Sequence, residues 1–162
     1  GVSGSGTWST TKHGTIANGL DFTGCSAFGF SCSSGGTAGT IKTNPLTFTT
    51  VYLNPGKTTP GITLKPSSGE TFVTFTCFIL TVTVHGSING HIESGCQDKN
   101  KVAIEFASKA NHGEVKWPRN TENINEPFDD LRVTKSGSTF TGSMDATGTV
   151  DFGGVTQDIH CV

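Results

Sequence analysis

The longest apolar-rich run of the chain, FVTFTCFILTVTVHG at positions 72–86, limits what the chain can fold into. In its first half Val73, Phe75 and Cys77 stand at odd positions, and in its second half Leu80, Val82 and Val84 stand at even positions. Side chains alternate between the two faces of a strand, so one regular strand cannot keep both sets on one side. The run therefore predicts two strand segments that meet at Phe78-Ile79, through a bulge, a corner or a strand end. The alternative is one strand that is apolar on both faces and buried between layers.

The rest of the chain repeats this pattern of short alternating segments with turn residues between them. KVAIEFA at 101–107 places its apolar residues on one face, and Asn18-Gly19 and Asn89-Gly90 are typical of tight turns. Only 15% of the residues are charged, 22 of the 162 are glycine, and no stretch has the period of an amphipathic helix. These features predict an all-β protein, an antiparallel β-sandwich or barrel of about ten to twelve short strands.

One β domain over residues 1–162 is expected, because a chain of this length fits one domain with a usable core. Residues 1–7, GVSGSGT, have the composition of a flexible lead or linker. Residues 109–130 form the most polar and irregular stretch and are expected to be a long surface loop.

Five cysteines, at positions 25, 32, 77, 96 and 161, show neither a CxxC pair nor zinc-finger spacing. This pattern favours structural disulfides in an extracellular or cell-surface protein. The odd count leaves one thiol that is free, buried or paired outside the chain. Spacing alone leaves the pairing open.

Charge and hydropathy argue against a nucleic-acid-binding surface and against a membrane-spanning segment. The net charge is −2 and the few Lys and Arg are scattered, so no nucleic-acid surface is expected. No apolar run reaches the roughly 18 residues that a membrane span needs. No motif indicates a cofactor, and none is expected.

Several segments resemble a known family when they are taken together. They are FTGCSAFGFSC (22–32), GTIKTNPL (39–46), GITLKPSSGETFVTFTC (61–77), VTVHGSI (82–88) and the weaker IEFASKANHGE (104–114). They resemble a family of secreted, Gly/Thr-rich β-proteins of actinobacteria whose function is uncharacterised. The resemblance covers about the middle two thirds of the chain and implies an all-β secreted domain, and it carries over no catalytic residue.

Two departures from this family bear on the cysteines. Members of the family have a segment similar to TCGG where this chain has Thr76-Cys77-Phe78-Ile79. They also tend to begin with a strand of the form I-T-C, which this chain lacks. The chain ends in DIHCV instead, so the resemblance implies that the last strand takes the place of the missing first one. That strand would act within one chain or be donated to the next subunit. Both versions imply the disulfides Cys77–Cys161 and Cys25–Cys32, with Cys96 left as a free or intermolecular thiol.

The expected function is therefore that of a non-enzymatic, secreted or cell-surface structural protein. It would be a subunit of an extracellular fibre or assembly, a homo-oligomer completed by its C-terminal strand. The alternative is a monomeric secreted module that binds carbohydrate or another surface ligand through the 109–130 loop and Trp117, with Trp8 as a second candidate aromatic. Core packing is an equal alternative for either tryptophan. A hydrolase or calcium site would need the acidic residues of the loop, whose spacing fits no EF-hand: Glu122, Glu126, Asp129 and Asp130.

Overall fold

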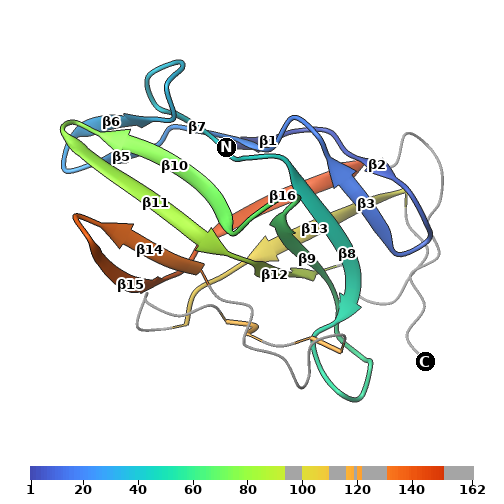
Figure 1. Cartoon of the computed structure of the whole chain (residues 1–162). Helices are drawn as coiled ribbons and strands as arrows, with labels where there is room; N and C mark the ends of the chain where they lie inside the picture. Colours follow the sequence, from blue (N-terminus) through green and yellow to red (C-terminus); the bar gives the residue numbers. More distant parts are fainter. Residues whose placement is uncertain (94–99, 110–115, 119, 122–130, 152–162) are drawn as a thin grey trace.

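A computed structural model describes residues 1–93, 100–109, 116–118, 120–121 and 131–151 (Figure 1). This part of the chain forms sixteen strands in three sheets, every strand pair in them is antiparallel, and it contains no helix. The expected all-β, sandwich or barrel-like class is confirmed. The strands outnumber the ten to twelve expected, because five of the sixteen have only two or three residues. No helix of the described residues is long and apolar enough to cross a membrane.

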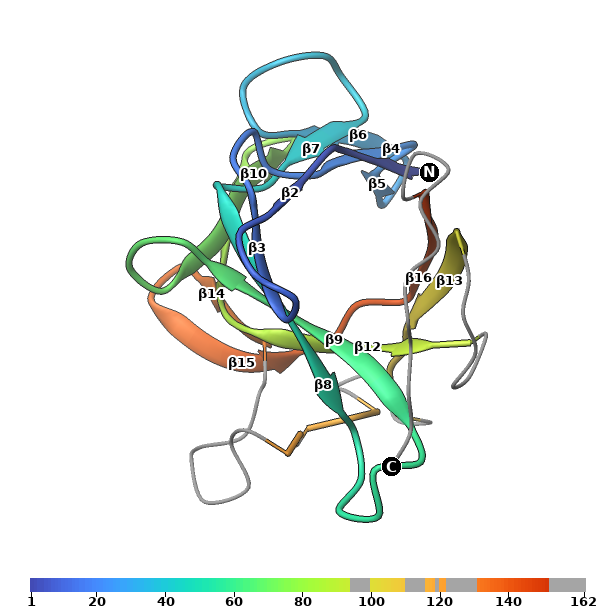
Figure 2. The same cartoon turned by 90° about the vertical axis from the view of Figure 1, so that its right-hand side faces the viewer.

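The largest sheet has seven strands in the order β16-β13-β12-β9-β8-β3-β2. Their bounds are Ala146–Asp151, Lys101–Phe106, Ile88–Ile92, Pro60–Pro66, Leu46–Tyr52, His13–Ile16 and Thr7–Trp8. Side chains alternate between its two faces: in β8, Leu46 and Phe48 are buried, while Thr47 between them and Thr49 after them are partly exposed. Figure 2 shows the strands curling around the interior.

The second sheet has six strands in the order β15-β14-β11-β10-β6-β5. Their bounds are Ser138–Gly142, Leu131–Lys135, Leu80–Gly86, Thr71–Cys77, Phe30–Ser33 and Ser26–Ala27. Three of its strand pairs are hairpins with two-residue turns: β5–β6, β10–β11 and β14–β15. The three turns lie at the same end of the sheet, because β11 and β14 are antiparallel neighbours and β6 runs beside the end of β10.

A third sheet of three strands, in the order β1-β4-β7, includes the start of the chain. Its strands are Val2–Ser3, Asp21–Thr23 and Thr40–Lys42. Val2 pairs with Phe22, and the amino group of Gly1 donates to the carbonyl oxygen of Thr23 at 2.9 Å. Within the expected flexible lead, residues 1–3 thus pair with β4, and Thr7 pairs with Thr15 of β3.

The apolar core lies between the seven-stranded and six-stranded sheets. Its most buried members are Leu46 and Ile88, which are both 0% exposed. The other buried members come from both sheets: Ile16, Phe48, Ile62, Leu64, Phe72, Val73, Ile92, Val102, Ile104 and Leu131. Burial of this set at about 25 cal/mol per Å² of apolar surface is what holds the two sheets together.

The run at 72–86 is two strands, as its change of parity predicts. β10 and β11 pair along their length and are joined by the two-residue turn Phe78-Ile79. Phe78 has a φ of 57°. The junction is thus a tight hairpin, which reverses the chain and puts both apolar sets on one face.

The two Asn-Gly dipeptides behave differently. Gly19 has a φ of 68° and donates its amide to Ile16, so the turn at 18–19 is confirmed. Asn89-Gly90 was expected to be a hairpin turn and instead lies inside β12, which is a correction. The reason is packing: a Cβ on Gly90 would lie 2.6 Å from Phe106 and 2.7 Å from Ile104, so this strand position accepts only glycine.

Candidate functional site

The disulfide pairing differs from the one that the family resemblance implies. Cys32 of β6 and Cys77 of β10 are opposite residues of neighbouring strands, 4.2 Å apart at their Cα atoms, and form a disulfide. The bonds Cys25–Cys32 and Cys77–Cys161 are therefore wrong. Cys25 precedes β5, is half-buried and is free, and its thiol donates to the carbonyl oxygen of Phe22 at 3.4 Å.

Several expected features lie outside the described residues. They include Cys96, Cys161 with the C-terminal strand, and the acidic residues 122, 126, 129 and 130 of the polar loop. Within the described residues, no three or more His, Cys, Asp or Glu side chains come together as metal ligands would.

An open sheet edge is the first surface that can bind something. β15 ends the order of the six-stranded sheet, and no described strand lies beyond it. The two-residue turn Ser136-Gly137 makes Lys135 and Ser138 a hydrogen-bonded pair. Pairs alternate along the ladder, so the backbone N–H and C=O groups of Thr139 and Thr141 point away from β14. We call Thr139, Phe140 and Thr141 the β15 edge.

Two of the devices that usually protect a sheet edge, proline and charged side chains, are absent from the β15 strand. The first four residues of this strand, STFTG, are exposed. Phe140 is 56% exposed. It ends a row of apolar side chains that crosses the sheet from Val73 through Val84 and Val133.

The opposite face of the same strands carries a row of threonines. Thr74 and Thr83 of β10 and β11 bring their hydroxyl oxygens to 3.2 Å, and Thr134 and Thr139 of β14 and β15 to 3.3 Å. Thr83 lies opposite Thr134, so the row crosses all four strands and ends at the β15 edge. The two rows themselves hold no charge, although Arg132 lies opposite Thr141 and Lys135 lies opposite Ser138.

A second surface consists of Phe28, Phe30, Phe78 and Ile79, and we call it the apolar end. Phe28 is 96% exposed and Ile79 83% exposed, at the turns of the β5–β6 and β10–β11 hairpins. Phe30 and Phe78 stack across the two hairpins with ring centroids 4.5 Å apart. The Cys32–Cys77 disulfide lies directly behind them and joins the two hairpins.

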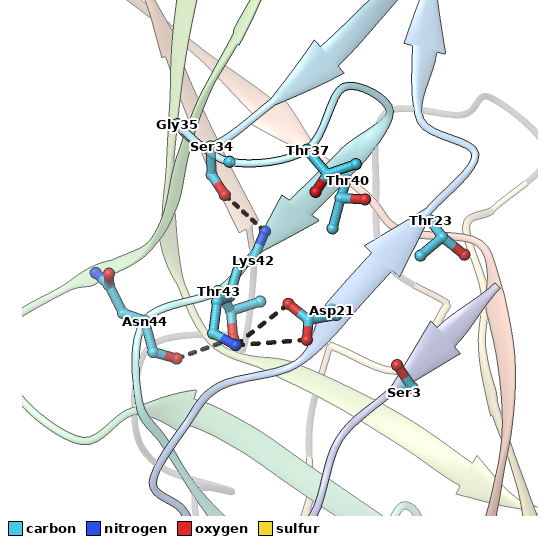
Figure 3. A pocket seen from close by; sticks show the side chains of 11 residues that line it. Ser3, Asp21, Thr23, Ser34, Gly35, Thr37, Thr40, Lys42, Thr43 and Asn44 are labelled. Atoms are coloured by element: carbon cyan, nitrogen blue, oxygen red, sulfur yellow. Dashed lines mark hydrogen bonds and ion pairs between the residues drawn. The ribbon is translucent and has the colours of Figure 1, made fainter.

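A polar hollow of about 650 Å³ lies beside the three-stranded sheet (Figure 3). The loop at 34–37 forms one wall, and β4 and β7 form another. Hydroxyl groups dominate its lining, and those of four residues make no hydrogen bond to any described residue: Ser3, Thr23, Thr37 and Thr40. Such a hollow can exchange hydrogen bonds with a polar molecule, but no aromatic ring lines it to add stacking.

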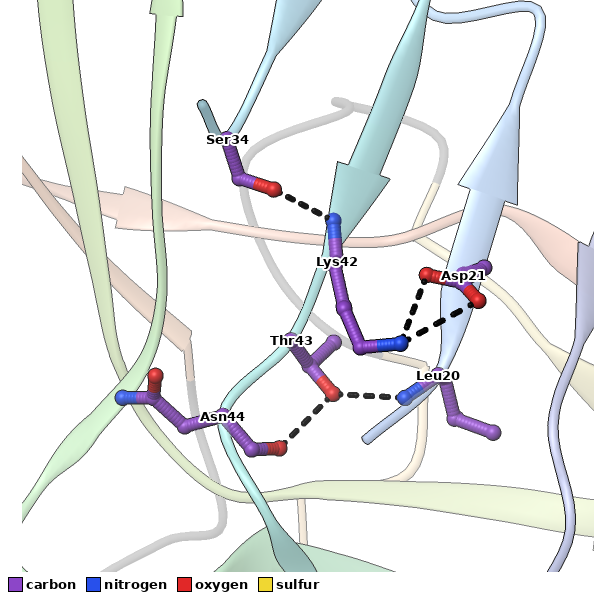
Figure 4. Close-up of polar contacts among 6 residues, drawn as sticks. All are labelled: Leu20, Asp21, Ser34, Lys42, Thr43 and Asn44. Atoms are coloured by element: carbon purple, nitrogen blue, oxygen red, sulfur yellow. Dashed lines mark hydrogen bonds and ion pairs between the residues drawn. The ribbon is translucent and has the colours of Figure 1, made fainter. Parts of the chain in front are cut away.

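The charged and amide groups of the hollow mostly hold the fold together (Figure 4). The Lys42 ammonium lies 3.4 Å from Asp21, and the Lys42 amide donates to the Ser34 hydroxyl at 2.8 Å. The Thr43 hydroxyl accepts from the Leu20 amide and donates to the carbonyl oxygen of Asn44, both at 2.9 Å. These contacts tie β7 to β4 and to the loop after β6, so we regard the hollow as a structural joint.

Trp117 lies on the outside of the seven-stranded sheet. Its ring is tilted against His91 with centroids 5.4 Å apart, and the Lys116 ammonium stands 4.6 Å from its centroid. A buried amide cluster holds this segment in place: Asn89, 1% exposed, donates to the carbonyl oxygen of Trp117 at 3.0 Å and accepts from Thr63 at 2.6 Å. The 109–130 stretch is thus not wholly a solvated loop, because Asn120 is also buried and donates to both Thr63 and Asn89.

Trp8 lies in β2 at the far edge of the same sheet. Its ring meets Phe48 edge-to-face with centroids 4.6 Å apart, and 39% of the residue is exposed. Its contact with Phe48 agrees with core packing, and a role of Trp8 in ligand binding stays a prediction.

Comparison of the chain with protein families, with curated proteins and with solved structures finds no match in any of the three. The resemblance to a secreted actinobacterial family stays a prediction. The two surfaces that stand out, the β15 edge and the apolar end, were not among the residues expected from the sequence. The sequence holds a signal for each surface. For the β15 edge it is an uncharged strand directly after a hairpin turn, and for the apolar end it is bulky residues at two-residue turn positions.

Proposed function

We propose that the chain is a non-enzymatic extracellular structural domain whose copies join by strand addition at the β15 edge. The observation that carries this proposal is the direction of the Thr139 and Thr141 backbone groups, which have no partner strand among the described residues. The Cys32–Cys77 disulfide supports an oxidising, extracellular setting.

A second copy of β15 fits this edge in one antiparallel register. Centred on Phe140, that register places Thr139 opposite the partner's Thr141, and Thr141 opposite the partner's Thr139. Both are then hydrogen-bonded pairs, each exchanging two N–H···O=C bonds. The two Phe140 side chains become a close, non-hydrogen-bonded pair, so the apolar row through Val133 continues into the second copy. The contact is self-complementary, as a two-fold dimer requires.

The proposal keeps strand addition but not the covalent lock through Cys77, which is already paired with Cys32. Without that lock a five-residue edge gives only a few hydrogen bonds and one aromatic pair. These must offset the entropy of association, so we expect a dissociation constant in roughly the micromolar to millimolar range.

Sedimentation velocity of the protein at increasing concentration tests the proposal. Thr141→Pro removes one outward N–H without breaking a β14–β15 hydrogen bond, and should leave a monomer. Thr141→Ala keeps that N–H and should still associate. Association that is equal in both variants would overturn the proposal, provided that the two have the same circular dichroism spectrum.

A carbohydrate module built on Trp117 has less support. Lys116 and His91 both contact the indole, so a sugar ring would have to displace a side chain before it could stack.

A further inference from the structure

We propose that the apolar end is a docking surface for the interfacial region of a lipid bilayer. The proposal concerns a different surface from the β15 edge and does not depend on strand addition. Four large apolar side chains are exposed at one end of the molecule, where the β5–β6 and β10–β11 hairpins end (Figure 1).

The backbone of the turns indicates that these side chains are held outward at a cost. Phe28 and Phe78 have φ angles of 52° and 57°, in the left-handed region that bulky residues rarely adopt. Phe28-Gly29 stands where a two-residue turn with both φ angles positive prefers Asn-Gly. Strained positions of this kind are frequent at functional sites, and here each places a phenylalanine in solvent.

The shape and chemistry of the apolar end favour a bilayer over a protein pocket. The side chains sit on two projecting turns, and Phe and Ile offer no hydrogen-bond donor or acceptor by which a protein partner could be recognised. Aromatic and aliphatic side chains on a protruding surface partition readily into the boundary between headgroups and acyl chains. Lipid accommodates a convex surface without requiring a complementary one.

Little polar surface must be dehydrated when these turns enter lipid. The backbone is paired up to Ala27–Phe30 in one hairpin and Cys77–Leu80 in the other, so only two residues per turn lie outside a ladder. The segments at 25–32 and 76–81 contain no charged residue, and serine and threonine hydroxyls flank the turns. Because no cluster of Lys or Arg is present there, we expect binding that depends weakly on salt and on anionic lipid.

The disulfide gives this end its rigidity. Cys32–Cys77 ties the two hairpins together immediately behind the Phe30–Phe78 stack. The four side chains therefore enter a bilayer as one preformed unit, without the ordering entropy of a flexible loop.

The paired substitution Phe28→Asn with Phe78→Asn separates docking from folding. Asn is favoured in the left-handed region, so this variant should be at least as resistant to urea as the wild type. Its binding to phosphatidylcholine vesicles, measured by cosedimentation, should fall about tenfold or more because two aromatic anchors are lost. Phe140→Asn removes an exposed phenylalanine of the β15 edge, and at protein concentrations too low for association it should bind vesicles like the wild type.

A tryptophan placed at position 28 reports insertion directly. Phe28→Trp should gain emission that brominated phosphatidylcholine quenches, whereas Phe140→Trp should gain emission that it does not quench. Equal quenching of both, or no vesicle binding by the wild type, would overturn the docking proposal. Self-association that Phe28→Asn with Phe78→Asn abolishes would also overturn it, in favour of a second copy. Thr141→Pro should dimerise less and bind vesicles unchanged, so the two proposals fail separately.

Discussion

Cys32 and Cys77 lie directly opposite each other on β6 and β10, and their disulfide is the main attachment between these strands. The ladder between β6 and β10 has only two residue pairs. The bond closes a sequence separation of 45 residues. Removing it in Cys32→Ser with Cys77→Ser should lower the free energy of unfolding by about 2–4 kcal/mol. Urea unfolding measures the loss.

Cys25→Ser is the matched control for that experiment. The serine hydroxyl can still donate to the carbonyl oxygen of Phe22, so unfolding should change little. Peptide mapping under non-reducing conditions should yield a linked Cys32–Cys77 peptide. A linked Cys25–Cys32 peptide, or equal unfolding with and without reductant, would contradict the pairing.

The buried amide cluster should matter both for stability and for the position of Trp117. Asn89→Ala leaves the buried Thr63 and Asn120 side chains and the Trp117 carbonyl each short of a hydrogen bond. We expect a loss of about 2–3 kcal/mol in the free energy of unfolding and a red shift of Trp117 emission. Fluorescence in a Trp8→Phe background isolates this signal. Asn100→Ala, at an exposed position, should change neither quantity.

Replacing each of two glycines that have nearly the same φ by alanine distinguishes the cost of backbone strain from the cost of a steric clash. Gly19 and Gly69 have φ angles of 68° and 65°. Nothing lies within 4 Å of a Cβ on Gly69, whereas a Cβ on Gly19 collides with the carbonyl of Thr43. Gly69→Ala should cost about 1 kcal/mol from the backbone alone. Gly19→Ala should cost at least about 1 kcal/mol more, and equal melting temperatures would contradict the packing described here.

The Lys101 side of the ion pair across β13 and β16 should respond to pH in the alkaline range. The hydrogen bond and charge of Asp151, 2.8 Å from Lys101, raise the pKa of that lysine above its ordinary value of 10.5. A raised pKa in the folded state gives stability that is present below the ordinary pKa and is lost as pH rises through the folded value. Asp151→Asn should bring the Lys101 pKa back toward 10.5 in an NMR titration. Between pH 6 and 9 the variant and the wild type should show the same pH dependence of stability.

The sequence could predict the strands because their apolar residues alternate, and the change of parity at Phe78-Ile79 located a real chain reversal. It could not predict how that reversal is made. A two-residue turn with phenylalanine in the left-handed region contradicts turn preferences, and only the surrounding sheet and the stacked Phe30 hold it.

At Asn89-Gly90 the sequence predicts a turn that the structure does not contain. The dipeptide favours a turn locally, but Ile104 and Phe106 on the neighbouring strand leave no room for any side chain at position 90. Asn89 is retained for the buried cluster beneath the Trp117 segment. Tertiary contacts thus explain both residues, and local propensity explains neither.

The pairing of the cysteines does not follow from the sequence, because it depends on which strands become neighbours. Nothing in the spacing of Cys25, Cys32 and Cys77 reveals that β6 lies beside the end of β10. The β15 edge and the apolar end were missed for a related reason, since exposure is a property of the assembled sheets.

Hydrogen exchange of the Thr139 and Thr141 amides, followed by NMR at increasing protein concentration, tests strand addition most directly. The Phe140 amide bonds to Val133 within one chain, so it should be protected at every concentration and serves as the internal reference. We expect the Thr139 and Thr141 amides to exchange rapidly in dilute solution and to gain protection together as the concentration rises toward the millimolar range. Exchange of both amides that stays rapid at every concentration would contradict assembly through the β15 edge.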